Sequence, residues 1–451
     1  MPSLILAIAR TTFIESVRQP VFFILVMLSG LFQLVNTAST GFALSYTESS
    51  EVSGDDKLLL DVGLATVLFC GTLLAAFIAT AAVSREIENR TVLTIVSKPV
   101  PRAAVVLGKY VGIAGALLVG GVAMIMFLEM GIRHGVLSTA KDEIDQPVMT
   151  YSLAAVGLSM LAGLWGNFFY GWHFTQTATL LLSPLLTLAW VLVLLTKKDW
   201  GWQPLGTDFK PQITTAAACV VLALLVLSAV ATAASTRLGQ VMTVVVCFGA
   251  FVLGLLSNHV FGRHAFQNDL IGQVINAEPL DARSESFEGS GDTYAVTLKT
   301  APTRLVAPGS PLYWGPNPNG FDLLVPAFEP YRGRVGDSNA YFAKSTPPAI
   351  VVTEVKDRTL TIRNIGATPL AVGRPPRADD FVFMTPTRVG RLALAAWAVV
   401  PNMQFYWLTD AVTQNRPVPI RHLGILLVYS LAQVVGFLGL AVVFFQRREV
   451  G

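Results

Sequence analysis

The sequence contains few charged residues and few cysteines. Of its 451 residues, 14% are charged and 53% are hydrophobic, whereas soluble domains carry roughly 25% charged residues. This composition argues against a single soluble globule, and the excess of apolar residues excludes a disordered chain. The net charge of +3 is too small to indicate a nucleic-acid-binding protein. The three cysteines lie in apolar runs and provide neither a disulfide framework nor a zinc site, so we expect them to be packing residues.

Motifs for catalysis and cofactor binding are also missing. The string nearest to a Walker A loop, residues 106–110, lacks the upstream glycine and the Ser or Thr after Lys109. The sequence contains no His-Glu-x-x-His and no Gly-x-Ser-x-Gly, and its five histidines show no metal-ligand spacing. The sequence therefore predicts no enzyme, no metal and no cofactor.

Long uncharged segments are the dominant feature of the chain. A bilayer core about 30 Å thick needs roughly 20 apolar helical residues. The run 146–196 would form a helix of about 76 Å, so we assign it two spans with a turn around Gly163, Gly166, Asn167, Gly171, His173 and Gln176. The sequence therefore predicts an all-α polytopic membrane protein with eight spans, in the uncharged runs 19–47, 62–84, 110–128, 146–196, 211–236, 238–262 and 422–446.

The positions of Lys and Arg predict the orientation. Basic residues precede the first span, fill the segment 85–109, lie between the sixth and seventh spans at Arg237, and follow the last span at Arg447 and Arg448. Eight spans put all four groups on one side, which we expect to be cytoplasmic. Lys197 and Lys198 fall on the other side. A single span in 146–196 would correct this, but it would move Arg447 and Arg448 outside, so eight spans are preferred.

Residues 263–391 interrupt the hydropathy with 14 Lys or Arg and 13 Asp or Glu. Alternating apolar and polar residues at 293–298, 349–355 and 359–363, separated by turn residues, predict a β-rich domain. In the eight-span arrangement this domain is extracytoplasmic. The aromatic segment 397–407 predicts a helix at the outer membrane interface, within a linker at 392–421. Residues 422–451 then form the last span and a cytoplasmic tail.

Glu129 is a charged residue near the outer end of the third span. Intramembrane charges often mark transport pathways. Arg133 follows four residues later, so an ion pair along the helix end is the expected role of Glu129.

The cytoplasmic segment 85–110 is the most informative part of the sequence. It reads as a charged helical continuation of the second span, an apolar turn, a break at Lys98-Pro99, and a return helix that begins near Pro101. A short helix held between two spans in this way can transmit force from a cytoplasmic partner. An ordinary positive-inside connection has the same spacing.

This segment resembles the cytoplasmic loop of ABC-2-type transporter permeases. The matching residues are Arg85, Glu86, Glu88, Thr91, Lys98, Pro99, Arg102, Gly108, Lys109 and Gly112. Arg90 stands where many members have glycine. Segments 8–15, 235–237, 400–402 and 444–449 are similar to the interfacial first helix, a cytoplasmic turn, the final outer helix and the end of the last span of that family. The hairpin 146–196 and the insert 263–391 depart from its six-span core.

The resemblance implies the membrane subunit of an ATP-driven transporter in a prokaryotic inner or plasma membrane. Such a subunit works as a dimer, here expected to be a homodimer, with two separate ATPase subunits. Residues 1–18 would form the interfacial helix, and 19–262 the first seven spans with a coupling loop at 85–102. The insert favours action on an extracytoplasmic partner protein over simple export. The implied ATPase-coupling residues are Arg85, Glu86, Glu88, Arg90, Thr91, Lys98, Pro99, Arg102 and Lys109.

Two other functions remain open at this point. In the first, the chain is a membrane-anchored binding or assembly protein whose β-rich domain is the functional part. In the second, it is a secondary carrier, although the lack of charged residues near mid-membrane weakens that interpretation.

Overall fold

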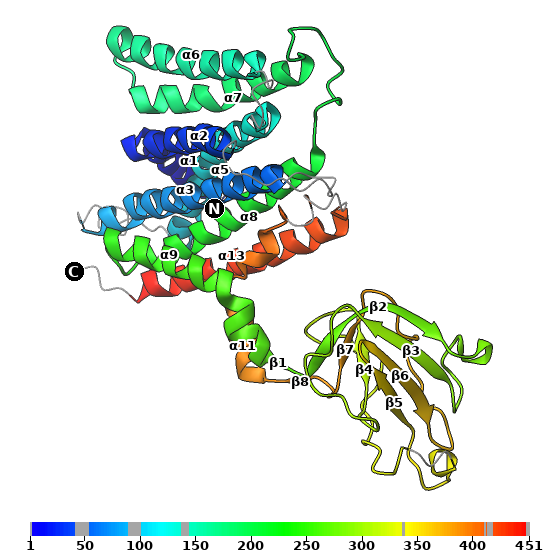
Figure 1. Cartoon of the computed structure of the whole chain (residues 1–451). Helices are drawn as coiled ribbons and strands as arrows, with labels where there is room; N and C mark the ends of the chain where they lie inside the picture. Colours follow the sequence, from blue (N-terminus) through cyan, green and yellow to red (C-terminus); the bar gives the residue numbers. More distant parts are fainter. Residues whose placement is uncertain are drawn as a thin grey trace. The chain divides into compact units, whose positions relative to one another are not determined.

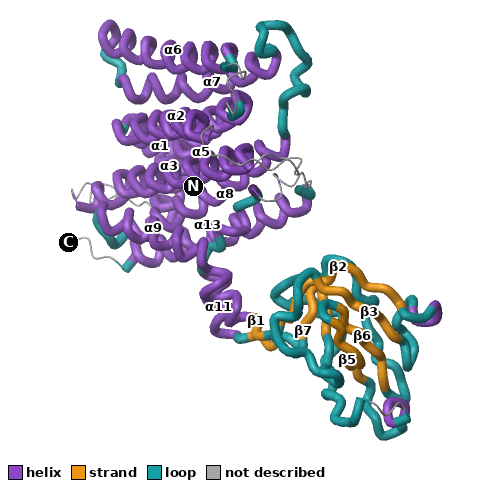
Figure 2. Tube along the Cα trace, viewed as in Figure 1, coloured by secondary structure: helices purple, strands orange, loops and turns teal. Residues whose placement is uncertain are grey.

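The computed structural model describes residues 2–40, 54–88, 101–136, 144–335, 339–409, 412 and 418–447. For residues 2, 54–56, 85–88 and 282 it describes the backbone alone. The chain forms two compact units, Met1–Leu255 with Pro401–Gly451, and Leu256–Val400. Figure 2 shows that the first unit is helical whereas the second holds the strands.

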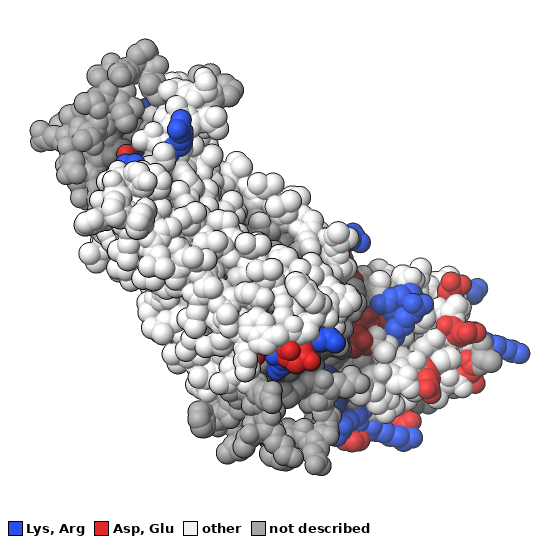
Figure 3. Space-filling model, turned by 90° about the horizontal axis from the view of Figure 1, so that it is seen from above, with Lys and Arg blue, Asp and Glu red and all other residues white. Residues whose placement is uncertain are grey.

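The helical unit is built from long apolar helices, labelled in Figure 1. They are α1 (Pro2–Arg18), α2 (Pro20–Thr40), α3 (Gly54–Glu88), α5 (Arg102–His134), α6 (Gln146–Tyr170), α7 (Phe174–Leu195), α8 (Pro211–Ser235), α9 (Gln240–Ser257) and α13 (Ile420–Gln446). Among the described residues, all of these except α1 are long and apolar enough to cross a membrane, and the span in α9 continues to Ala265. The eight expected spans are therefore present as eight candidate membrane-spanning helices. On the face drawn in Figure 3, the middle of the helical unit is almost free of charged side chains, as contact with lipid requires.

Small residues allow the helices to approach one another closely. A Cβ atom at Gly120 of α5 would lie 3.0 Å from Leu74 Cδ2 and 3.1 Å from Phe22 Cζ. At Gly71 of α3 it would lie 2.4 Å from Leu224 Cδ1 of α8. Such contacts are typical of helices packed inside a membrane, where association depends on close van der Waals packing.

The segment 146–196 forms the hairpin of α6 and α7. The turn occupies residues 171–173, where Gly171 adopts a left-handed conformation with φ 66° that suits glycine. The expected turn was therefore too wide, because Gly163 and Gly166 lie inside α6. A Cβ atom at Gly163 would lie 3.1 Å from Ala178 Cβ of α7, so this glycine serves the packing of the hairpin.

The second unit contains a six-stranded antiparallel sheet in the order β4-β7-β2-β3-β6-β5. Its strands are β2 (Leu270–Pro279), β3 (Thr293–Leu298), β4 (Tyr313–Gly315), β5 (Ala349–Lys356), β6 (Thr359–Ile365) and β7 (Phe381–Phe383). The backbone before β4 also bonds to β5, since the Leu312 amide donates to the Ile350 carbonyl and the Val352 amide donates to the Ser310 carbonyl. These bonds join the two edges of the sheet around an apolar core that includes Trp314 and Phe383.

A two-stranded ribbon, β1 (Phe266–Gln267) with β8 (Arg388–Val389), connects this sheet to two helical segments. One is the continuation of α9, the π-helical turn η1 (Asn258–Gly262) with α10 (Arg263–Ala265), and the other is α11 (Arg391–Val399). Trp397 Nε1 donates to Asn258 Oδ1 at 3.0 Å and ties the two together.

The expected helix over 397–407 is not continuous. Helix α11 ends at Val399, and a separate 3₁₀ turn, η4, covers Met403–Tyr406. Pro401 explains the break, because the residue before a proline avoids the helical region, and Val400 has the extended angles φ −75° and ψ 122°.

Candidate coupling site at the basic end of the helical bundle

Segments that are far apart in the sequence meet where α5 begins. Arg102 Nη1 donates to the carbonyl of Gln446, the last residue of α13, at 2.8 Å. The Arg237 guanidinium, just after α8, lies 6.0 Å from the centroid of the Phe444 ring. We call this region, with the ends of α3, α5, α8 and α13, the basic end of the bundle. Three of the four basic groups on which the predicted orientation depends meet here: the start of α5, Arg237, and the end of α13.

Two further contacts complete this end of the helical unit. Ser84 Oγ of α3 donates to the Leu238 carbonyl at 3.0 Å, so α3 is tied to the turn after α8. The fourth basic group, at Arg18, lies against the start of α7, where Thr175 Oγ1 donates to the Arg18 carbonyl at 2.7 Å.

The predicted coupling residues fall into three sets. Arg85, Glu86 and Glu88 lie on the last turn of α3, and only their backbone is described. Arg90, Thr91, Lys98 and Pro99 lie outside the described residues. Arg102 and Lys109 are described in full, on the first two turns of α5. Pro101 precedes this helix with extended angles, φ −60° and ψ 127°.

The two glycines of the segment 108–112 face α1. A Cβ atom at Gly108 would lie 2.8 Å from Ile8 Cβ, and one at Gly112 would lie 2.5 Å from the Ala9 carbonyl oxygen. Real Cβ atoms essentially never approach other atoms this closely. The spacing of four residues puts both glycines on one side of α5, and this side receives α1.

The two residues that follow Gly108 face other helices. Lys109 is only 5% exposed, and its ammonium group donates to the Ala82 carbonyl of α3. The Tyr110 hydroxyl donates to the Leu225 carbonyl of α8 at 3.1 Å. A buried ammonium group is stable only when it is hydrogen-bonded, so Lys109 fixes the distance between α3 and α5. This position also keeps Lys109 away from the surface that a partner protein would touch.

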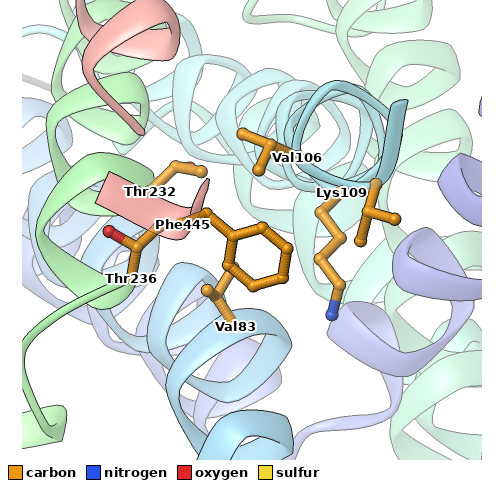
Figure 4. A pocket seen from close by; sticks show the side chains of 7 residues that line it. Val83, Val106, Lys109, Thr232, Thr236 and Phe445 are labelled. Carbon is orange, nitrogen blue, oxygen red and sulfur yellow. The ribbon is translucent and has the colours of Figure 1, made fainter. Parts of the chain in front are cut away.

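Figure 4 shows side chains that line a small cavity at the basic end. Side chains of Val83, Val106, Lys109, Thr232 and Phe445 converge from α3, α5, α8 and α13 on a cavity of about 10 Å³. That volume is at the lower limit for one water molecule. Among the described residues, this cavity is therefore too small for a substrate.

Helices α3 and α5 are longer than a membrane requires. At 35 and 33 residues, each is about 50 Å long at 1.5 Å per residue. Even a tilt of about 40° leaves their projection greater than the hydrocarbon thickness of about 30 Å. Both helices are therefore long enough to extend beyond the apolar layer.

The far ends of α5 and its neighbours hold a second polar cluster, which corrects one expectation. Glu129 does not pair with Arg133 among the described residues. Arg133 instead contacts Asp145 at 2.5 Å and Asp208 at 3.0 Å. Glu129 is 2% exposed and accepts a hydrogen bond from Thr214 Oγ1 at 2.8 Å. The expectation that Glu129 pairs with Arg133 considered only the helix that carries both residues. The partners come from other parts of the chain: Thr214 lies on α8, and Asp145 and Asp208 lie in the segments before α6 and α8.

Sequence reasoning missed Asp145 and Asp208. The signal for Asp145 was available, because an Asp before Gln146-Pro147 is a typical start of a helix, and its carboxylate does accept a hydrogen bond from the Val148 amide. Nothing in the sequence indicated that the same carboxylate also binds Arg133. The cluster borders a cavity of about 120 Å³ that Trp190 also lines. Among the described residues, no group of three or more His, Cys, Asp or Glu side chains is arranged to hold a metal.

Comparisons of the chain with family models, with curated proteins and with solved structures gave no match.

Proposed function

We propose that this chain is the membrane permease subunit of an ATP-driven transporter of the ABC-2 type, paired with a separate ATPase subunit and a second copy of itself. The observation that carries the proposal is the set of contacts made by the first turns of α5. Gly108 and Gly112 contact α1, Lys109 contacts α3, Tyr110 contacts α8, and Arg102 contacts α13. A force applied to the connection before α5 is therefore delivered to four other helices at once.

The proposed mechanism needs no chemistry in this chain. ATP binding and hydrolysis in the partner would shift the segment 89–100, and the rigid contacts at the basic end would convert that shift into a rearrangement of the helices. The β-rich unit would then act outside the cell on a substrate or a partner protein. A permease of this kind requires two helix arrangements of similar free energy, and the ATPase selects between them.

Substitution of Glu86 tests the proposal. Glu86→Arg reverses a charge on the last turn of α3, at the proposed ATPase contact. Loss of one partner of a buried interfacial ion pair costs about 2–5 kcal/mol, which is about 30-fold or more in affinity. We expect normal membrane insertion with a loss of ATPase co-purification, or with hydrolysis no longer stimulated by substrate. The matched control is Glu354→Arg on the β-rich unit, where the carboxylate is 54% exposed and pairs with Lys356.

The outcomes separate the three functions. If Glu86→Arg still binds the ATPase and couples hydrolysis as the wild type does, the segment 85–102 is an ordinary positive-inside connection. If no ATPase accompanies the wild-type chain from its native membrane, the proposal fails in favour of a membrane-anchored binding protein or a secondary carrier. Transport driven by an ion gradient in vesicles without ATP would then identify the carrier.

A further inference from the structure

The β-rich unit has a cleft of about 630 Å³ at the end of the sheet where β2 begins and β7 ends. Ligand sites in proteins typically have volumes of about 300–1,000 Å³. Its walls include Arg263, Asp269, Tyr313, Phe328, Met384 and Arg388, together with three prolines.

The charges in the cleft do not balance. Asp269 Oδ1 lies 2.5 Å from Arg304 Nη1, and its second oxygen accepts a hydrogen bond from Thr385 Oγ1 at 3.3 Å. The one carboxylate is thus already neutralised. Arg388 forms no ion pair within the part of the chain that the structure describes, and Arg263 contacts only the ring of His259 there, at 3.4 Å. Two exposed guanidinium groups are left to attract an anion.

The lining of the cleft also includes apolar groups held in place by their neighbours. The rings of Tyr313 and Phe328 are stacked, with centroids 4.7 Å apart and an interplanar angle of 22°. The Tyr313 hydroxyl donates to the Phe328 carbonyl at 3.4 Å, which holds the pair in place. Met384 and the prolines extend this surface. Such a wall offers van der Waals contact to an aliphatic group and little to a small hydrated ion.

The chain connects the cleft directly to a membrane-spanning segment. Arg263 belongs to the last turn of the candidate span Gln240–Ala265. Gln267 and Arg388 are paired across the ribbon β1–β8 that follows that turn. Along the chain, the arginine residues of the cleft therefore directly adjoin a candidate membrane span.

We propose that this cleft binds an anionic amphiphile supplied by the adjoining membrane leaflet. Arg263 and Arg388 hold its phosphate or carboxylate headgroup, and its apolar part lies against Phe328, which stacks on the buried Tyr313, and against Met384. The proposal does not depend on the ATPase, because the cleft lies entirely within the β-rich unit.

Titration calorimetry on the full chain in a neutral detergent tests the proposal. The probes are dihexanoyl phosphatidylglycerol, dihexanoyl phosphatidylcholine and inorganic phosphate, with both lipids below their critical micelle concentrations. We expect saturable binding of the phosphatidylglycerol, binding of the phosphatidylcholine that is about tenfold weaker, and no saturation with inorganic phosphate. The double substitution Arg263→Ala, Arg388→Ala weakens phosphatidylglycerol binding by at least about tenfold. The matched control, Arg283→Ala with Arg358→Ala, removes two exposed charges elsewhere on the same unit and leaves binding unchanged.

Three results would overturn the proposal. Equal binding of the two lipids would show that headgroup charge is not recognised. Inorganic phosphate that binds as tightly as the phosphatidylglycerol would show that the apolar wall contributes nothing. Unchanged binding in a cleft double variant that keeps the wild-type unfolding temperature would remove the arginines from the site. None of these results bears on whether an ATPase assembles with the chain.

Discussion

Gly112→Ala tests the close approach of α1 to α5, which is the tightest contact at the basic end. The added Cβ would lie 2.5 Å from the Ala9 carbonyl oxygen and 2.7 Å from Thr12 Cβ. Since carbon atoms pack best at about 3.5–4.0 Å, α1 has to retreat by about 0.8 Å. Two of the three nearest atoms belong to the backbone of α1, so no side-chain rotation relieves the clash. We expect a net destabilisation of about 1–3 kcal/mol, the usual cost of overpacking.

Two other glycine substitutions rank the effect. At Gly108 the nearest atoms are Ile8 Cβ and Cγ2 at 2.8 and 2.9 Å and the Ile5 carbonyl oxygen at 3.0 Å. The two shortest of these distances are longer than those at Gly112, so Gly108→Ala should cost less. A Cβ at Gly439 of α13 meets nothing within 4 Å. Gly439→Ala should be neutral, or stabilising by up to about 1 kcal/mol through helix propensity.

The assay combines unfolding with accessibility. Thermal unfolding of the purified chain in detergent should give the lowest midpoint for Gly112→Ala, then Gly108→Ala, then Gly439→Ala. Ser16 on α1 is fully buried, so a Ser16→Cys reporter should react faster with a thiol reagent when Gly112→Ala is also present. A Gly112→Ala chain as stable as Gly439→Ala, with an equally protected reporter, would refute the inferred contact between α1 and α5.

Three further predictions concern the other parts of the chain. Arg133→Met leaves the fully buried Asp145 without its cation and should destabilise the chain by about 3–5 kcal/mol. The control Arg304→Ala, at an arginine that is 61% exposed, should cost less than about 1 kcal/mol. Equal unfolding midpoints for the two variants would contradict the buried ion pair. The exposed Ser345, changed to Cys, should react with an impermeant thiol reagent on intact cells; reaction only after permeabilisation would place the β-rich unit in the cytoplasm and contradict the eight-span orientation. Burial raises the pKa of Tyr313 above its ordinary value of about 10, so the folded state favours the neutral phenol. The β-rich unit should therefore lose stability as the pH rises above 10, and strand-type circular dichroism would follow this loss. Unchanged stability through that range would count against a buried phenol.

The membrane helices were predictable because their signal is local. A run of about 20 apolar residues is sufficient to mark a span, and the uncharged run 211–236 differs from α8, Pro211–Ser235, by one residue at its C-terminal end. The alternation at 293–298 was equally local, and it coincides with β3, whose side chains alternate between half-buried and buried. Both patterns depend only on the period of the backbone and on which face is covered.

The contacts between elements were less predictable, because they depend on partners far away in the sequence. The glycines of the segment 108–112 were recognised as a motif, but their role in receiving α1 required the distance to Ala9. Lys109 is among the residues that the resemblance implies for ATPase coupling, and in the structure its ammonium group lies inside the bundle against Ala82. The sequence shows that a lysine is charged. The position of its hydrogen-bond acceptor depends on how the neighbouring helices pack.

The charged side chains at the two ends of α5 bind different kinds of acceptor. At the basic end, Arg102 and Lys109 donate to backbone carbonyls of α13 and α3. These acceptors belong to the helix backbone and do not depend on the side chain at that position. At the far end, Arg133 is held by the carboxylates of Asp145 and Asp208, which exist at one position only, and a shift would leave a buried charge unpaired. The contacts at the basic end thus hold the helices through their backbone, whereas the far end is held by ion pairs between single side chains. In the proposed mechanism, the ATPase would have to supply the free energy for any contact of Arg133 that the rearrangement breaks.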